Sequence, residues 1–273
     1  MNIFDIHTHI FPEKIADRAV HAIGEFYHLP MEGGGCSRGL LYHGQHIGTR
    51  GYAVCSVATS PHQAGHINDF IAAEVAAHPE FVGFATLHPA MADPQAELER
   101  VLKLGLKGIK LHPDQQQFYI DDPAAMEIYR LAERYKLPVL LHMGDETRDY
   151  SLPIRLARVL ERFADLCVIA AHLGGYRHWE EADRYLGGTN VYFDTSSSLA
   201  FLPPEKAADL ICRHGTHKVL FGTDYPLWHP EEELARFLAL PLTPHQQADI
   251  LWNNAAALLQ FTPPEEHKKT AHP

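Results

Sequence analysis

The sequence predicts an α/β fold, a single (β/α)8 barrel of the TIM type, and two observations indicate it. Short apolar runs alternate with longer amphipathic segments eight times along the chain. Several of these runs are continuously apolar, which is typical of strands buried on both faces. A doubly wound open sheet is the alternative. Eight regular units, with no glycine-rich dinucleotide turn after the first run, favour the barrel.

The expected strands and helix starts follow from these patterns. Strands are predicted at residues 3–7, 53–58, 81–86, 108–112, 138–142, 166–171, 190–194 and 217–221. Asp93 and Asp122 each precede a proline, so each is expected to be an N-cap followed by proline at the first helical position. Thr243 with Gln246 forms a capping-box pattern before a helix expected at 248–259.

The first loop breaks the regular spacing, because about forty residues separate the first two strands. It contains a helix-like segment over 12–27 and a glycine run over 33–35. In a barrel, this loop opens onto the catalytic face. The enlarged first βα loop is therefore either a lid or pocket wall, or a tolerated surface insertion. We assign residues 1–262 to the barrel and 263–273 to a polar C-terminal tail.

Composition argues against several classes of partner. The 273 residues include 23 Lys and Arg against 34 Asp and Glu, which gives a formal net charge of −11. With no basic run, the chain is not expected to bind nucleic acid or an anionic membrane surface. No apolar stretch approaches the ~18 residues of a membrane span. The acidic start Met1–Asp5 and four widely spaced cysteines indicate a cytoplasmic protein with reduced thiols.

Chemistry-bearing side chains follow the expected strand ends. In a parallel barrel these ends meet at one mouth. The residues at these positions are His7, His9, Lys110, His112, His142, His172 and Asp224. Neutral imidazoles and a carboxylate are the ligands of zinc and similar divalent ions. With 20 histidines, chance pairs are expected, but joint placement at the strand ends favours a metal site over structural histidines.

The same segments resemble the amidohydrolase superfamily. They are Phe4–His9, Gly108–Pro113, Leu141-His142, Ala171–Gly175 and Phe221–Pro226, and Asn253–Leu259 is similar to the last helix of one branch. That branch is the amidohydrolase-related one, which includes the aminocarboxymuconate-semialdehyde decarboxylase group.

The resemblance implies roles for individual residues. His7, His9, His142 and Asp224 correspond to the metal ligands, and Asp224 also to the proton-transfer group. His172 corresponds to an acid/base or transition-state-stabilising histidine. One divalent ion is expected, with zinc first and manganese or another ion as alternatives. A second ion requires carboxylation of Lys110, which is otherwise a substrate anchor or a structural amine.

Two reactions remain open for such a site. The first choice is a hydrolase in which metal-activated water attacks a small-molecule amide, ester, lactone or cyclic C–N bond. The alternative is a metal-dependent non-oxidative decarboxylase of a small unsaturated or aromatic acid. Substrate-binding candidates are His112, Arg148, Arg177 and Trp228, although each arginine is also a candidate for a solvated surface residue. The expected partner is a small-molecule substrate, and the resemblance allows a homodimer.

Overall fold

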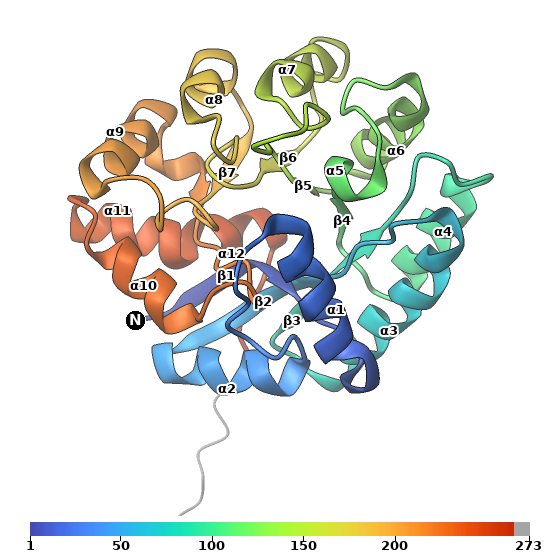
Figure 1. The fold of residues 1–273 in the computed structure, drawn as a ribbon, viewed down its shortest axis with the longest axis horizontal. Coiled ribbons are helices and arrows are strands. Elements are labelled where there is room, and N and C mark those ends of the chain that lie inside the picture. Colours follow the sequence, from blue (N-terminus) through green and yellow to red (C-terminus); the bar gives the residue numbers. More distant parts are fainter. Residues whose placement is uncertain (265–273) are drawn as a thin grey trace, which may run out of the picture.

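The computed structural model describes residues 1–264 as a barrel of eight parallel strands surrounded by helices (Figure 1). The strands pair in chain order. They are β1 (Ile3–His9), β2 (Thr49–Cys55), β3 (Phe81–Thr86), β4 (Gly108–Leu111), β5 (Val139–Leu141), β6 (Val168–Ala170), β7 (Tyr192–Asp194) and β8 (Val219–Leu220). The predicted (β/α)8 barrel is confirmed. From residue 265 on, the predicted polar tail lies outside the described residues.

Hydrogen bonds between the first and last strands bring the two ends of the sheet together. Ile6 N donates to Phe221 O at 2.9 Å. One step nearer the mouth, Asp224 N donates to His7 O at 2.8 Å. The side chain of Asp5 adds to this seam, because its Oδ2 accepts a hydrogen bond from Thr223 Oγ1 at 2.7 Å. The position of Asp224 relative to β1 is therefore set by backbone contacts.

Helices follow the strands and cover the outside of the barrel. They are α1 (Glu13–Tyr27), α2 (Ser37–Ile47), α3 (Ala64–Ala77), α4 (Pro94–Lys103), α5 (Pro113–Gln116), α6 (Met126–Tyr135), α7 (Pro153–Arg162), α8 (Trp179–Leu186), α9 (Pro204–His214), α10 (Pro230–Leu238), α11 (Pro244–Ala248) and α12 (Asn254–Leu259). Short turns of 3₁₀ type are η1 (Pro61–Gln63), η2 (Pro123–Ala125) and η3 (Thr216–Lys218), and η4 (Asp249–Asn253) is a π-helical turn.

The predicted helix starts are confirmed. Asp93 Oδ1 accepts from Ala96 N at 2.9 Å and begins α4, while Asp122 caps η2. The capping box at Thr243 begins α11. The helix expected at 248–259 is interrupted by η4, where Ile250 O accepts a hydrogen bond from Phe221 N at 3.0 Å. The π turn thus presents a helix carbonyl to the end of β8.

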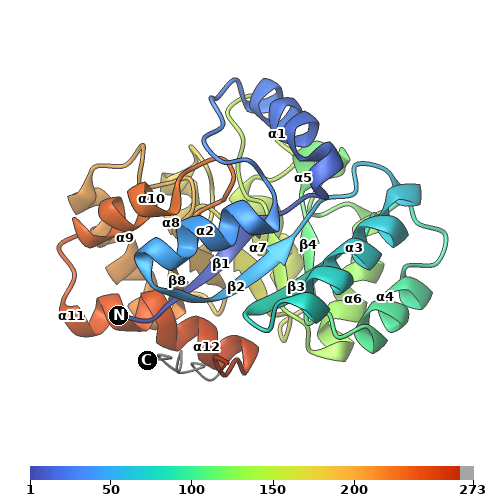
Figure 2. The same ribbon diagram turned by 90° about the horizontal axis from the view of Figure 1, so that it is seen from below.

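The enlarged first loop supplies two helices with different positions. Figure 2 shows α1 over the mouth of the barrel, whereas α2 lies on the outer wall. Helix α2 packs against α10. Below the mouth, the barrel interior is filled by apolar side chains of alternate strand positions, among them Phe4, Ile6, Phe84 and Leu140. This packing seals the lower part of the barrel, so polar chemistry is confined to the mouth.

No helix in the described part of the chain is long and apolar enough to cross a membrane. All four cysteines are free thiols.

Candidate metal centre at the barrel mouth

Three of the four predicted ligands converge at the seam between β1 and β8. His7 and His9 are two residues apart on β1, so their rings face the same way. Their Nε2 atoms are 3.2 Å apart, and Asp224 Oδ1 lies 3.5 Å from His7 Nε2 and 3.4 Å from His9 Nε2. Ligands about 2.1 Å from a tetrahedral zinc ion lie about 3.4 Å from one another. The three atoms therefore have the spacing of one face of such a coordination shell.

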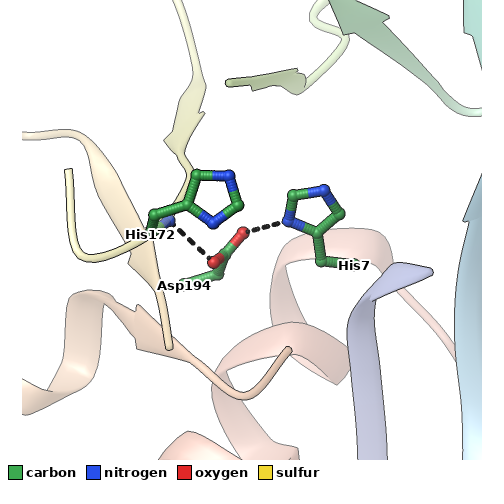
Figure 3. A group of neighbouring side chains, drawn as sticks. All are labelled: His7, His172 and Asp194. Carbon is green, nitrogen blue, oxygen red and sulfur yellow. Dashed lines mark hydrogen bonds and ion pairs between the residues drawn. The ribbon is translucent and has the colours of Figure 1, made fainter. Parts of the chain in front are cut away.

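A carboxylate behind His7 fixes the orientation of its ring. His7 Nδ1 donates to Asp194 Oδ2 at 2.9 Å, and Asp194 Oδ1 accepts from the backbone N–H of His172 at 3.0 Å (Figure 3). This bond leaves the lone pair on Nε2 of His7, which is the arrangement of a carboxylate–histidine–metal triad. Asp194 was not among the sequence candidates, although it is the last residue of the seventh predicted strand.

Lys110 lies in the same buried space. Its Nζ is 2.8 Å from Nε2 of His7, and the side chain is fully buried. Burial lowers the pKa of the Lys110 amine, because the charged form loses its solvation. Lys110 thus lies beside the predicted ligands. Its Nζ contacts Nε2 of His7, the nitrogen whose lone pair would bind a metal.

Burial and neighbouring charge set the protonation of the three ligand groups. Burial, followed by the charge of Lys110, lowers the pKa of His7 to about 4. For His9, burial acts in the same direction, but Cys55 and the Asp224 carboxylate outweigh it and raise the pKa to about 9. Burial would raise the pKa of Asp224, yet the charge of His7, a hydrogen bond from His9 and the charge of His172 hold it well below its usual range. The group is thus an anionic carboxylate among imidazoles.

The fourth predicted ligand, His142, lies on the β5 side of the mouth in a different group. Its ligand atom lies within 4.8 Å of those of His112 and Asp114, and its ring stacks on His112 at a centroid distance of 3.8 Å. Nδ1 of His142 is 2.9 Å from Nε2 of His172. Burial is the main cause that lowers the pKa of all three histidines. The structure therefore brings His142 together with His172 and His112.

His172 contacts both the His7 group at the β1–β8 seam and the His142 group at β5. Its ring lies 5.3 Å from that of His7, and its Nδ1 is 2.9 Å from Ser196 Oγ. It is 2% exposed, and the cavity lining includes His142 but not His172. His172 is thus positioned behind His142 when viewed from the cavity.

A second chain of hydrogen bonds holds Asp224. Ser197 Oγ donates to Asp224 Oδ2 at 2.6 Å, and Trp228 Nε1 donates to Ser197 Oγ at 3.0 Å. Trp228, predicted to contact substrate, instead supports Asp224 through Ser197. Both Ser197 and Asp224 have positive φ, as does His172. Such conformations cost roughly 1–3 kcal/mol each in non-glycine residues and gather at functional sites.

A cavity of about 1050 Å³ opens above the ligand cluster. Helix α1 forms one wall, so the structure supports the lid-or-wall interpretation of the first loop. His7, His9, Lys110, His112, His142 and Asp224 lie at its base. The walls are largely apolar and aromatic, with Phe11, Ile15, Ile23, Phe26, Tyr27, Met31, Ile67, Phe70 and Leu227 among them. Tyr27 also contacts the base, since its hydroxyl is 2.5 Å from Nε2 of His112.

The cations at the cavity differ from those predicted. Arg148 pairs with Asp145 at 3.3 Å and lies over the ring of Phe26, so it supports the α1 wall from outside. Arg177 pairs with Glu146 at 2.7 Å and packs on Phe201. Neither arginine lines the cavity.

Instead, Lys14 and Arg18 line it, one turn apart on α1. Both are exposed, and the described residues give neither of them an ion pair. The sequence could have indicated Lys14 and Arg18, because they form a basic pair at helical spacing in the enlarged first loop.

The donor set fits a divalent metal. It combines neutral-capable imidazoles and one anionic carboxylate at ligand spacing, and an outer carboxylate orients one ring. His7, His9 and Asp224 would hold the ion, and His142 faces the same cavity from β5.

The chain is similar to known proteins over nearly its full length. A family model described as amidohydrolase matches residues 4–261. A curated relative, gamma-resorcylate decarboxylase of Polaromonas sp. (strain JS666 / ATCC BAA-500), is 23% identical over 264 residues, covering 77% of this chain and 79% of the relative.

Solved structures share the fold. An uncharacterised TIM-barrel protein from Bordetella bronchiseptica superposes with a TM-score of 0.78 at 23% identity, covering 95% of this chain and 99% of the other. A dihydroxybenzoic acid decarboxylase from Polaromonas sp. JS666, with bound manganese and the inhibitor 2-nitroresorcinol, superposes with a TM-score of 0.70 at 18% identity. The coverage is 95% of this chain and 97% of that one.

Proposed function

Because the chain belongs to the amidohydrolase family, we propose that it is a metal-dependent, non-oxidative decarboxylase of a small aromatic acid. The observation that carries the proposal is the cavity. A metal-type donor set lies at its base, aromatic and aliphatic side chains form its walls, and Lys14 and Arg18 stand at its α1 wall. This combination suits a flat apolar ring that carries an anionic group.

From the sequence alone, hydrolysis is the first choice and decarboxylation the alternative. The order is reversed here because named relatives support the second reaction. The curated relative is a decarboxylase, and the structure with bound manganese and the inhibitor 2-nitroresorcinol is that of another decarboxylase. Zinc is therefore no longer the preferred metal, and manganese is an equal candidate.

We propose His7, His9 and Asp224 as ligands, with His142 completing the set from β5. The bound ion would supply a Lewis acid that polarises substrate oxygens. Lys110 Nζ and the ion compete for the same lone pair of His7, so Lys110 is expected to turn away from His7 when the site is loaded. It is then free to donate to a substrate oxygen.

The remaining residues position the substrate and move one proton. Decarboxylation breaks the bond between the ring carbon and the carboxylate, releases carbon dioxide and places a proton on that carbon. We propose that Asp224 Oδ2 carries this proton. It takes the proton from a substrate hydroxyl or from solvent and returns it to the carbon.

Ser197 keeps that oxygen in place through its 2.6 Å hydrogen bond. His172 acts on the substrate through His142, since the two rings are joined at 2.9 Å. The apolar walls exclude water, which favours loss of a carboxylate over its solvation.

The test is a paired substrate screen on the full chain loaded with manganese or zinc. Carbon dioxide release from hydroxylated benzoates, starting with dihydroxybenzoates, is expected, with little turnover of matched benzamides, benzoate esters and aromatic lactones. The Asp224→Asn variant is the control and should lose turnover while retaining its fold by circular dichroism. Hydrolysis of the second set, without carbon dioxide from the first, would overturn decarboxylation and restore the hydrolase.

A further inference from the structure

A second group of imidazoles and a carboxylate lies outside the barrel, where α2 packs against α10 (Figure 1). His43 and His46 are one turn apart on α2 and share a face. His229 is the residue that precedes α10, and Glu231 lies in the first turn of that helix. The first loop and the segment after β8 thus each contribute to one cluster, with no residue shared with the barrel mouth.

Three residues of this cluster, His43, His229 and Glu231, have ligand atoms at the spacing of metal ligands, and His46 contacts Glu231. Nδ1 of His43 is 3.1 Å from Glu231 Oε1, and Nδ1 of His46 is 3.3 Å from the same oxygen. One ligand atom each from His43, His229 and Glu231 lie within 4.8 Å of one another. The two short separations are close to the edge of about 3.4 Å expected between ligands of a tetrahedral zinc ion.

Unsatisfied polar atoms point to something that fills the centre. Nδ1 of His229 and Oε2 of Glu231 are buried, and neither has a hydrogen-bond partner among the described residues. Leaving such an atom unpaired costs roughly 1–3 kcal/mol. A carboxylate oxygen carries only lone pairs, and an imidazole nitrogen offers one in its neutral form, so a cation satisfies both.

The surrounding charge also favours a cation. Glu32 lies beside the cluster, because its Oε2 accepts a hydrogen bond from the backbone N–H of His229 at 2.9 Å. The rings that approach the cluster, Tyr42 on His46 and Tyr225 on His43, are neutral.

We propose that His43, His229 and Glu231 form a second divalent-metal site, with His46, which contacts Glu231, as the fourth ligand of the structural type that zinc prefers. It fastens α2 to α10. The ligand set is closed by protein groups, so it leaves no position for substrate. Its role is to hold the first loop against the segment that follows Asp224, independently of the reaction at the mouth.

The experiment measures zinc stoichiometry in a background that lacks the mouth site. The metal-stripped His7→Ala/His9→Ala protein is titrated with zinc, and bound metal is counted by mass spectrometry after dialysis. One tightly held ion per chain is expected. Adding Glu231→Gln, which keeps the side-chain shape and removes the charge, should abolish it. Adding His217→Ala/His245→Ala, which removes two exposed histidines elsewhere, should leave it in place.

A second readout does not depend on that background. Zinc should raise the melting temperature of the His7→Ala/His9→Ala protein and fail to do so once Glu231→Gln is added. If the double variant does not fold, Glu231→Gln in the otherwise unchanged chain should hold one ion fewer than the parent. The proposal is overturned if the background protein binds no zinc, or if its ion survives Glu231→Gln.

Discussion

On the β1 and β8 side of the barrel mouth, a carboxylate lies within 3.5 Å of each imidazole, whereas on the β4 and β5 side the imidazoles contact one another more closely than they contact Asp114, whose Oδ2 lies 3.7 Å from His142 Nε2. His7 bonds to Asp194 and His9 lies beside Asp224. Across the mouth, His142 stacks on His112 and joins His172. A carboxylate fixes the tautomer and leaves a lone pair for a cation. Stacked, buried imidazoles stay neutral and serve better as hydrogen-bonding groups. We therefore propose that the first side supplies most of the ligands of the ion, and that the second side, apart from His142, meets the substrate.

The largest effect is expected from removing the first side. His7→Ala/His9→Ala eliminates two of the three clustered ligand atoms, so the mouth should lose its ion and turnover should fall below detection. Metal counting and a carbon dioxide assay measure both. The α2–α10 ion should persist in this variant. An unchanged metal content at the mouth would show that the two sides do not differ in the way described.

The second side is tested by comparing His142→Ala with His112→Ala. If His142 completes the ligand set, its loss should weaken metal binding by more than the roughly 10–100-fold typical of an outer partner. His112→Ala should leave metal affinity near that of the parent and raise KM. An effect of His142→Ala on metal affinity as small as that of His112→Ala would remove His142 from the ligands.

Asp194→Asn tests the orienting carboxylate. The amide can still meet His7 Nδ1 but no longer holds the ring by charge, so metal affinity should fall roughly 10–100-fold. Excess metal should restore much of the turnover. Glu233→Gln is the matched control, because Glu233 is equally buried but bonds to Arg236. It should lower the melting temperature and leave metal affinity unchanged, as measured by competition with a chelator.

The smallest effect on activity is expected at a buried histidine that does not line the cavity at the mouth. His214 stacks on Phe193 at 3.7 Å, and its Nε2 donates to Val191 O. Burial lowers the pKa of His214 to about 4 from 6.5. The folded state therefore binds fewer protons than the unfolded state between these values, and stability falls as pH drops from 6.5 to 4.

The loss reaches at most about 3 kcal/mol across that window. His214→Gln should flatten this part of the stability profile in urea titrations, with turnover at neutral pH unchanged. The exposed His21→Gln should keep the parent profile. A His214→Gln profile as steep as that of the parent would remove burial as the source of the pH dependence.

Local patterns predicted the barrel because strand burial and helix capping are local. The run at 81–86 is β3 to the residue, and Asp93 caps as expected. The same patterns found His7, His9 and Asp224 through their places at strand ends. They missed Asp194 and Ser197, whose roles depend on partners 187 and 27 residues away. They also misplaced Arg148 and Arg177, because no local pattern tells which face of the mouth a loop side chain turns to.

The seam between the first and last strands has a consequence for biosynthesis. His7 emerges early from the ribosome and Asp224 some 217 residues later, so no shorter nascent chain holds the assembled cluster. Loop closure over that length is the slowest kind of contact to form. Metal capture at the mouth should therefore report completion of the barrel, and truncated chains that end before β8 should leave the ion in solution.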